Sequence, residues 1–209
     1  MQLRSDNLTD GQPIPARHAF CQPAADGPVE LAPNVSPHLA WSEVPEGTAG
    51  FALVVVDPDA PTVADDVNQE GRTVSADLPR ADFHHWALVD LPADCRELAE
   101  GACSDGVTAK GKQDPPGPVG SRQGRNDYTG WFAGDPDMGG TYHGYDGPAP
   151  PWNDERVHRY HFRLLALDVP RLDVGDGFDV PAVLAAAEGH VLAEATLTGT
   201  YTLNPALRG

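Results

Sequence analysis

The hydrophobic pattern of the chain consists mainly of short apolar runs separated by turn residues. The clearest run is Phe51–Val56, which ends at the sequence DPDAP, residues 57–61. A short apolar run bounded by turn residues is typical of a strand that is buried on both faces. Proline has no amide hydrogen to donate to a neighbouring strand, so we expect this strand to end at the DPDAP segment.

Three further segments alternate between apolar and polar residues in the manner of strands. The first is 83–92, with one predicted face formed by His85, Ala87, Val89 and Leu91. The second is 157–169, with one predicted face formed by His158, Tyr160, Phe162, Leu164 and Ala166. The third is 196–203, TLTGTYTL. Weaker signals predict an edge strand within residues 1–22 and a short strand ending at Trp41.

Helical signals are few. A short helix is predicted over 94–103 with Asp94 as its N-cap, and a second is predicted to open at Asp179 with Pro181 in its first turn. Gly189 should weaken or divide the second helix. Residues 62–82 and the glycine- and proline-rich stretch that begins at residue 110 have no clear period and are predicted as long loops.

The order of these elements predicts the fold class. Strands outnumber helices and do not alternate with them, which disfavours a parallel sheet with crossover helices. We therefore expect a mainly β fold, a β-sandwich of antiparallel sheets with a few short peripheral helices. A chain of 209 residues is long enough for one full hydrophobic core, so we expect a single domain over 1–209.

Charge narrows the range of partners. The chain has 31 acidic and 14 basic residues, a net charge of −17. Such a surface repels nucleic acid and anionic membranes, so neither is expected as an electrostatic partner. The acidic residues are scattered along the sequence, which is typical of a solvated surface.

Cysteine usage and hydropathy bear on location. Cys21, Cys95 and Cys103 are odd in number and form no CxxC pair, so we expect reduced thiols and a cytoplasmic protein. The first 15 residues lack the apolar core of a signal peptide. No run approaches the roughly 20 apolar residues of a membrane span, so no integral membrane association is predicted.

Chemically active residues gather at the ends of the predicted strands. Asp57 and Asp59 follow the first strand, and His85 lies at the start of the second. His158 and Tyr160, two positions apart, share a face of a third strand.

If these strand ends converge, they form a small pocket. Imidazole, phenol and backbone amide groups near Gly147 would donate hydrogen bonds to a phosphate, sulfate or carboxylate. Asp57 would hold the nearest imidazole protonated. We therefore expect an anion-binding pocket, and we expect the replacement of His158 or Asp57 to abolish binding while leaving the fold intact.

Two other chemistries use the same residue types. Two histidines and two carboxylates could bind a metal, but the sequence has no HExxH or HxH pattern, so neither a metal nor another cofactor is predicted. A phosphate-ester hydrolase or phosphotransferase could use the Asp–His cluster as nucleophile or general base. The chain offers no evident activated serine or cysteine, so a non-enzymatic role is favoured and no catalytic residue is assigned.

A set of ordered motifs spans most of the chain. They are SPHLAW with VPEGT, DPDAP, HHW, NDYTG, GYDGPAPP, HRYHF with LLALD, and LAEATLTGTY. Together they resemble the phosphatidylethanolamine-binding protein family, in its bacterial and archaeal Raf-kinase-inhibitor-like branch. This resemblance implies an antiparallel β-sandwich with a small cavity for phosphate-type or carboxylate anions.

The resemblance also assigns residues by motif. It implies that the cavity is formed by Asp57, His85, Gly147, Pro148, His158 and Tyr160. Asp59 and Pro61 are expected to shape the DPDAP loop rather than to contact ligand. Residues 62–82 and 110–144 look expanded relative to the family pattern and are interpreted as inserted loops.

These observations predict a binding protein for a phosphorylated or carboxylated small molecule or lipid head group. A regulatory role through a protein partner is a further hypothesis, for which the chain identifies no partner. A homodimer is an open alternative for the oligomeric state.

Overall fold

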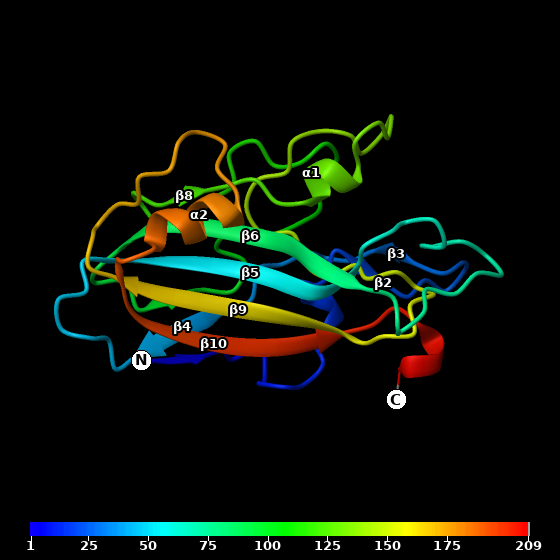
Figure 1. Ribbon diagram of the computed structural model, residues 1–209, viewed down its shortest axis with the longest axis horizontal. Coiled ribbons are helices and arrows are strands. Elements are labelled where there is room, and N and C mark those ends of the chain that lie inside the picture. The colour runs from blue at the N-terminus through cyan, green and yellow to red at the C-terminus, as the bar shows by residue number, and fades with distance from the viewer. Residues whose placement is uncertain (209) are drawn as a thin grey trace.

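The computed structural model describes residues 1–208 and consists mainly of antiparallel strands (Figure 1). Its largest sheet has five strands in the order β10-β9-β5-β6-β8, and each neighbouring pair is antiparallel. The strands are β5 (Gly50–Pro61), β6 (Arg80–Pro92), β8 (Arg122–Gln123), β9 (His158–Leu167) and β10 (Val191–Tyr201).

Smaller elements surround this sheet. A three-stranded sheet has the order β1-β4-β7 and is formed by β1 (Gln2–Arg4), β4 (Leu39–Ser42) and β7 (Glu97–Leu98). A separate pair consists of β2 (Cys21–Gln22) and β3 (Glu30–Leu31). The helices are η1 (Ala16–His18), α1 (Tyr128–Trp131), α2 (Val180–Ala187) and η2 (Pro205–Leu207). The predicted mainly β fold with a few short helices is confirmed.

The five-stranded sheet separates two apolar clusters, because successive residues of a strand point to opposite faces. Phe51, Leu53 and Val55 of β5 lie in the cluster that contains Trp41 of β4, between the two sheets. The alternate residues of β5 lie in the second cluster, which α2 covers (Figure 1). Burial on both faces explains why this stretch of β5 is apolar without interruption.

The strand β5 does not end before DPDAP, as the sequence predicted. Its pairing with β9 stops at Val56, but its pairing with β6 continues to Pro61 opposite Arg80. The register shifts between Asp57 and Ala60, so an extra residue of β5 is accommodated in a bulge. A bulge is a place where a sheet tolerates proline. The DPDAP segment is therefore a bulged strand with one edge unpaired, and not a turn.

The strand β6 is also irregular. Its register shifts at His85, which has no Cα partner on β5, and again near Asp90, whose backbone φ is 61°. The second shift places Leu91 in the cluster of Trp86. The prediction that Leu91 shares a face with Ala87 is therefore wrong, because Ala87 lies in the opposite cluster.

The helix predicted over 94–103 is wrong. Glu97 and Leu98 pair with β4 as the strand β7, and Leu98 is buried in the core. Short helices are marginal without tertiary contacts. Burial of Leu98 therefore outweighs the capping signal of Asp94.

The carboxyl-terminal elements follow the predicted order with a shifted boundary. Asp179 caps α2 as predicted, its Oδ1 accepting a hydrogen bond from the amide of Ala182 at 3.1 Å. The helix ends before Gly189, which has a φ of 82°. The last strand begins at Val191, earlier than the predicted residue 196.

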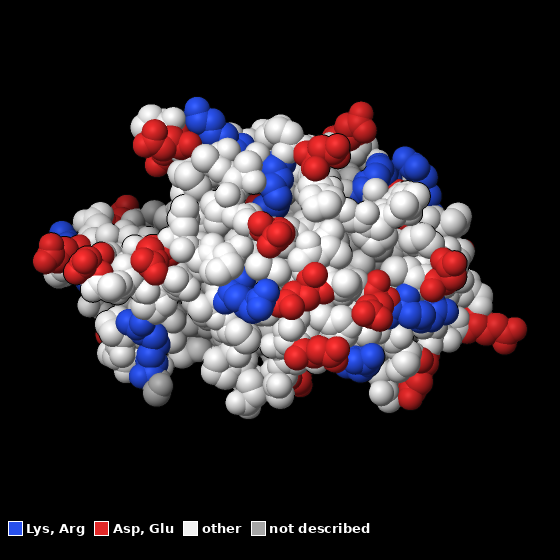
Figure 2. Space-filling view, turned by 180° about the vertical axis from the view of Figure 1, so that it is seen from behind, with Lys and Arg blue, Asp and Glu red and all other residues white. Residues whose placement is uncertain are grey.

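The charged surface is mixed in sign. Acidic and basic side chains alternate over the face shown in Figure 2 and form no continuous acidic block there. None of the helices within residues 1–208 is long and apolar enough to cross a membrane.

Candidate functional site

A cavity of about 270 Å³ opens at the end of the large sheet where β5 finishes and where β6 and β9 begin. Four residues selected from the sequence line it together: Asp57, His85, His158 and Tyr160. The remaining walls are largely apolar and include Phe20, Phe83, Tyr128, Trp131, Phe132 and Pro151. The cavity therefore combines a polar end with an aromatic body.

Local strand geometry brings the four polar residues together. Asp57 is the first residue of the bulged DPDAP segment. His85 occupies the irregularity in β6, and bulges re-aim side chains in this way next to functional sites. His158 and Tyr160 are two positions apart on β9 and so share one face.

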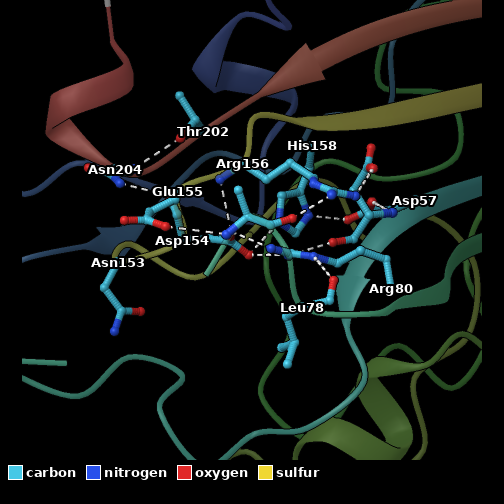
Figure 3. A network of polar contacts seen from close by, with 12 residues as sticks. Asp57, Leu78, Arg80, Asn153, Asp154, Glu155, Arg156, His158, Thr202 and Asn204 are labelled. Carbon is cyan, nitrogen blue, oxygen red and sulfur yellow. Dashed lines mark hydrogen bonds and ion pairs between the residues drawn. The ribbon is translucent and has the colours of Figure 1, made fainter. Parts of the chain in front are cut away.

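His158 is the centre of a buried network of polar contacts (Figure 3). Its Nδ1 lies 2.7 Å from Asp57 Oδ2, and its Nε2 lies 3.1 Å from Asp154 Oδ2. Asp154 in turn accepts two hydrogen bonds from Arg80, at 2.5 and 2.9 Å. Burial alone lowers the pKa of His158, but the hydrogen bonds to Asp154 and Asp57 outweigh it and raise the pKa to about 9. The ring is therefore an imidazolium near neutral pH.

The expectation that Asp57 holds the nearest imidazole protonated agrees with this arrangement, but the role expected for His158 as a ligand donor does not. A carboxylate only accepts hydrogen bonds, so both N–H groups of His158 are engaged, with Asp57 and Asp154. No N–H of this ring is left for a ligand. The contacts also lead us to expect, contrary to the sequence-based expectation, that replacing His158 destabilises the fold, because two buried carboxylates would lose their shared partner.

His85 is held in the opposite state. Its Nδ1 lies 2.8 Å from the backbone oxygen of Asp146, which can only accept, so Nδ1 carries the hydrogen. Burial lowers the pKa of His85, while the charge of Asp57 acts in the raising direction. The neutral ring therefore has a bare Nε2, and this atom has no hydrogen-bond partner among residues 1–208.

Asp146 fixes the position of that ring. Its carboxylate accepts hydrogen bonds from Asn34 and Asn126, each at 2.8 Å, and from Lys112 Nζ at 2.6 Å. Burial raises the pKa of Asp146, and Lys112 opposes this effect. Lys112 and Asn126 belong to the segment predicted as an inserted loop, so that segment supports His85 from behind.

Tyr160 has a buried hydroxyl without a partner. Its side chain is 1% exposed, and its Oη makes no hydrogen bond within the described part of the chain. Burial, the nearby Asp57 charge and a close approach of the hydroxyl to the Asp57 carboxylate raise the pKa of Tyr160 well above its ordinary value, so the phenol stays protonated. Asp57 is therefore the nearest acceptor for this hydroxyl, although the two groups do not meet the geometry of a hydrogen bond. Tyr128, on another wall, differs because its hydroxyl donates to the backbone oxygen of Gly147 at 2.7 Å.

Gly147 and Pro148 lie behind the cavity wall. The Gly147 amide donates to Asn34 Oδ1 at 2.8 Å, so the amide expected to bind an anion is already used. The Pro148 oxygen accepts from the Phe20 amide at 2.8 Å. A Cβ on residue 147 would collide with the His18 carbonyl oxygen, which explains the glycine. The next residues of the same loop, 149–151, line the cavity instead.

Asp59 points away from the cavity and braces the bulge. Its carboxylate accepts from Arg159 Nε at 2.8 Å and from Arg159 Nη2 at 2.9 Å. Its amide donates to Asp57 Oδ1 at 2.8 Å. Pro61 lies on the cavity wall. These contacts fit the loop-shaping role expected for Asp59 and add Pro61 to the lining.

The segment between β5 and β6 forms one wall and is anchored, although it contains no helix or strand. Asn68 lines the cavity, its amide donates to Asn153 Oδ1 at 2.9 Å, and its Oδ1 accepts from the Trp152 amide at 3.0 Å. The Asn153 Nδ2 donates to the backbone oxygen of Asp66 at 2.8 Å. The wall is therefore tied to the loop that precedes β9.

Sequence reasoning missed Asp154, Arg80, Asp146 and Tyr128. Asp154 lies four residues before His158, outside any strand, so no periodic pattern marks it. Arg80 reaches it only because β6 runs beside β5. The NDYTG motif contains Tyr128 and the GYDGPAPP motif contains Asp146, so these two could have been selected from the motifs. No cluster of three or more histidine, cysteine, aspartate or glutamate residues within 1–208 is arranged to hold a metal ion.

Comparisons with known proteins agree with this architecture. The model of the family described as Phosphatidylethanolamine-binding protein matches residues 4–202. The UPF0098 protein YbhB of Escherichia coli (strain K12) is 37% identical over 202 residues, covering 97% of this chain and 100% of YbhB. A UPF0098 protein of Methanothermobacter thermautotrophicus is 35% identical, covering 96% of this chain and 98% of the relative.

A solved structure gives the same result. The crystal structure of E. coli YbcL, described as a new member of the mammalian PEBP family, matches with a TM-score of 0.68 and 29% identity. The match covers 96% of this chain and 97% of YbcL. The class is thus an antiparallel β-sandwich with short peripheral helices. The chain belongs to the phosphatidylethanolamine-binding protein family, in the branch that contains YbhB and YbcL.

Proposed function

We propose that the protein binds small organic anions of the phosphate or carboxylate type in this cavity without transforming them. The acidic group would lie at the polar end beside Tyr160 and His85, and the organic body would lie along the aromatic walls. The observation that carries this proposal is the Tyr160 hydroxyl, a buried donor without a partner on a cavity wall. A donor buried in this way costs stability unless a ligand uses it.

The hydrogen bonds and protonation of Asp57 and His158 favour ligand binding over catalysis. Asp57 accepts from His158 through Oδ2 and from the Asp59 amide through Oδ1, which restricts it as a nucleophile. His158 is protonated, and both of its ring N–H groups donate hydrogen bonds to carboxylates, so it is a poor general base. Cys21 lines the cavity, but burial raises the pKa of its thiol to about 11, so it is not an activated nucleophile.

His85 is the group that keeps a hydrolase alternative open. Its bare Nε2 could accept a proton from water and so act as a general base. Release of nitrophenol from 4-nitrophenyl phosphate, lost on His85→Ala, would establish that alternative. We expect no such release, with or without divalent cations.

The proposal also bears on the source of the ligand, the location of the protein and its partners. The ligand source would be a phosphorylated or carboxylated metabolite or a lipid head group, since both present the same acidic chemistry. Reduced thiols support a cytoplasmic location. A regulatory protein partner or a homodimer would be an additional role, tested by the oligomeric state and by capture with the purified chain.

A calorimetric titration tests the proposal directly. Phenyl phosphate and benzoate are titrated into the wild-type protein, into Tyr160→Phe and into the control Tyr201→Phe. The Tyr201 hydroxyl donates to the Cys21 oxygen at 3.0 Å and does not line the cavity. A hydrogen bond to a charged group contributes about 1.5–3 kcal/mol, so Tyr160→Phe should weaken binding about 10- to 100-fold.

The control should bind within threefold of wild type, where about threefold corresponds to roughly 0.65 kcal/mol. The proposal would be overturned if the wild type bound neither phenyl phosphate nor benzoate. Equal binding by wild type and Tyr160→Phe would also overturn it.

A further inference from the structure

We propose that the cavity selects an anion that carries its own acidic hydrogen, and therefore prefers a phosphate monoester to the sulfate ester of the same organic body. This inference rests on the proposed function, because it concerns the same cavity. It specifies the protonation state in which the ligand is bound, a property that none of the four cavity residues reveals by itself.

The tautomer of His85 decides whether this ring offers a ligand a donor or an acceptor. The bond from Nδ1 to the Asp146 backbone oxygen fixes the ring hydrogen on Nδ1. The Asp146 position is itself fixed by Asn34, Asn126 and Lys112. The ring therefore cannot simply turn to present its N–H to a ligand without leaving a buried carbonyl oxygen unpaired. Nε2 of this cavity-lining residue is therefore left as an acceptor.

The polar end of the cavity offers a ligand more hydrogen-bond acceptors than donors. Asp57 is an acceptor only, and both N–H groups of His158 are already given to carboxylates. Tyr160 contributes the one free hydroxyl among the four polar residues described above. A ligand with acceptor atoms alone can satisfy Tyr160 but would direct lone pairs at His85 Nε2 and at Asp57.

A singly charged phosphate monoester matches this arrangement. Its P–OH group can donate to His85 Nε2, while one of its other oxygens accepts from Tyr160. A sulfate ester has the same tetrahedral shape and one negative charge, but it holds no hydrogen near neutral pH. The two esters therefore differ mainly in the donor that the cavity requires.

The charges around His85 favour the same choice. Asp57 approaches from β5, Asp127 from the turn before α1, and Asp146 from the loop behind the ring. Tyr160 and Tyr128 face the ring edge-on and stay neutral. Burial lowers the pKa of His85 and the three carboxylates oppose this without reversing it. The His158 imidazolium on the same wall is already paired with Asp57 and Asp154. A second negative charge on the ligand would therefore meet no unpaired cation among the residues that line the cavity, which disfavours the phosphate dianion.

Proton uptake is the measurable consequence. A phosphate monoester has a second pKa near 6. At pH 7.5 it is mostly a dianion in solution, so binding of the monoanion takes up close to one proton. Calorimetry in two buffers with different ionisation enthalpies measures this number directly.

The experiment compares 4-nitrophenyl phosphate with 4-nitrophenyl sulfate on the wild-type protein at pH 7.5, with Tyr160→Phe to locate the binding. Sites built to hydrogen-bond a ligand hydroxyl reject analogues without it strongly, so we expect the phosphate to bind about 100-fold tighter or more. We also expect uptake of between a half and one proton for the phosphate ester.

The outcomes separate this inference from the proposed function. If both esters bind with similar affinity and both weaken in Tyr160→Phe, the cavity binds anions but does not require an acidic hydrogen, and only this inference is overturned. Sulfate binding accompanied by proton uptake would mean that His85 takes the proton, which also overturns it. If neither ester binds but benzoate does, only this inference is overturned, because benzoate has no acidic hydrogen at pH 7.5. If none of the three binds, both proposals fail.

Discussion

The two histidines of the cavity show opposite solutions to burial. His158 is protonated, and both of its nitrogens bond to carboxylates at 2.7 and 3.1 Å. His85 is neutral, bonds a backbone oxygen through Nδ1 and leaves Nε2 free. The pKa of His158 is raised to about 9 and that of His85 is lowered, although both rings are buried at the same end of one sheet.

The difference separates a supporting side of the cavity from a second side, which we call the binding side because the proposed function places the ligand there. On the supporting side, the charges alternate along a chain of hydrogen bonds that runs from Asp57 through His158 and Asp154 to Arg80. On the binding side, His85 Nε2 and the Tyr160 hydroxyl lack partners within residues 1–208. Groups that are saturated in the folded chain stabilise it, whereas an unsatisfied group on a cavity wall can gain a partner from a ligand.

The largest expected effect falls on the supporting side. His158→Ala leaves Asp57 and Asp154 buried without their shared partner, and breaking a buried ion pair costs about 3–5 kcal/mol. His85→Ala removes one bond to a backbone oxygen, so its cost should be nearer 1–3 kcal/mol. Urea unfolding of both variants measures the difference. Equal losses, or a larger loss in His85→Ala, would remove the distinction between the two sides.

A second prediction uses pH to sharpen the comparison. Because the folded-state pKa of His158 is raised from 6.5 to about 9, its contribution to the free energy of unfolding is fully present below pH 6.5. It should be lost as pH rises towards 9, by about 3 kcal/mol on the linkage relation. The pKa of His85 is lowered, so its contribution is present above pH 6.5 and lost as pH falls.

Unfolding free energies at pH 6.5, 7.5 and 9 test this prediction. The comparison of wild type with His158→Ala isolates the ring from other titrating groups. The alkaline loss should be clear in the wild type and much smaller in the variant. An identical alkaline loss in both proteins would show that His158 is not the group responsible.

The third prediction concerns two tyrosines on the same cavity. Tyr128 donates its hydroxyl to the Gly147 oxygen, so Tyr128→Phe leaves that buried oxygen without this donor and should cost about 1–3 kcal/mol. Tyr160→Phe removes a hydroxyl that lies near Asp57 without the geometry of a hydrogen bond, so it should cost clearly less than Tyr128→Phe. Thermal unfolding of the two variants without ligand gives the contrast.

Much of the fold and part of the site follow from sequence. The uninterrupted apolar run at 51–56 predicts a strand buried on both faces, and the structure places it at the centre of the large sheet. The motifs select Asp57, His85, His158 and Tyr160, which the structure brings to one cavity. These predictions rest on local periodicity and on motif identity, both of which can be read directly from the amino-acid sequence.

The rest depends on long-range pairing. The bulges at His85 and in the DPDAP segment arise from register between β5 and β6, which local sequence does not determine. Arg80 and Asp154 meet across 74 positions of sequence, so their role was not predictable from spacing. For the same reason sequence alone treated both histidines as anion ligands, whereas the structure gives His158 two carboxylate partners.

The central claim is that Tyr160 is kept unsatisfied for a ligand, and one variant tests it most directly. Tyr160→Phe is compared with wild type for thermal unfolding, first without ligand and then with saturating phenyl phosphate. We expect a variant at least as stable as wild type without ligand, and a clearly smaller rise in Tm than that of wild type at the same phenyl phosphate concentration. A variant that is destabilised without ligand, and is then stabilised by phenyl phosphate as strongly as wild type, would contradict the claim.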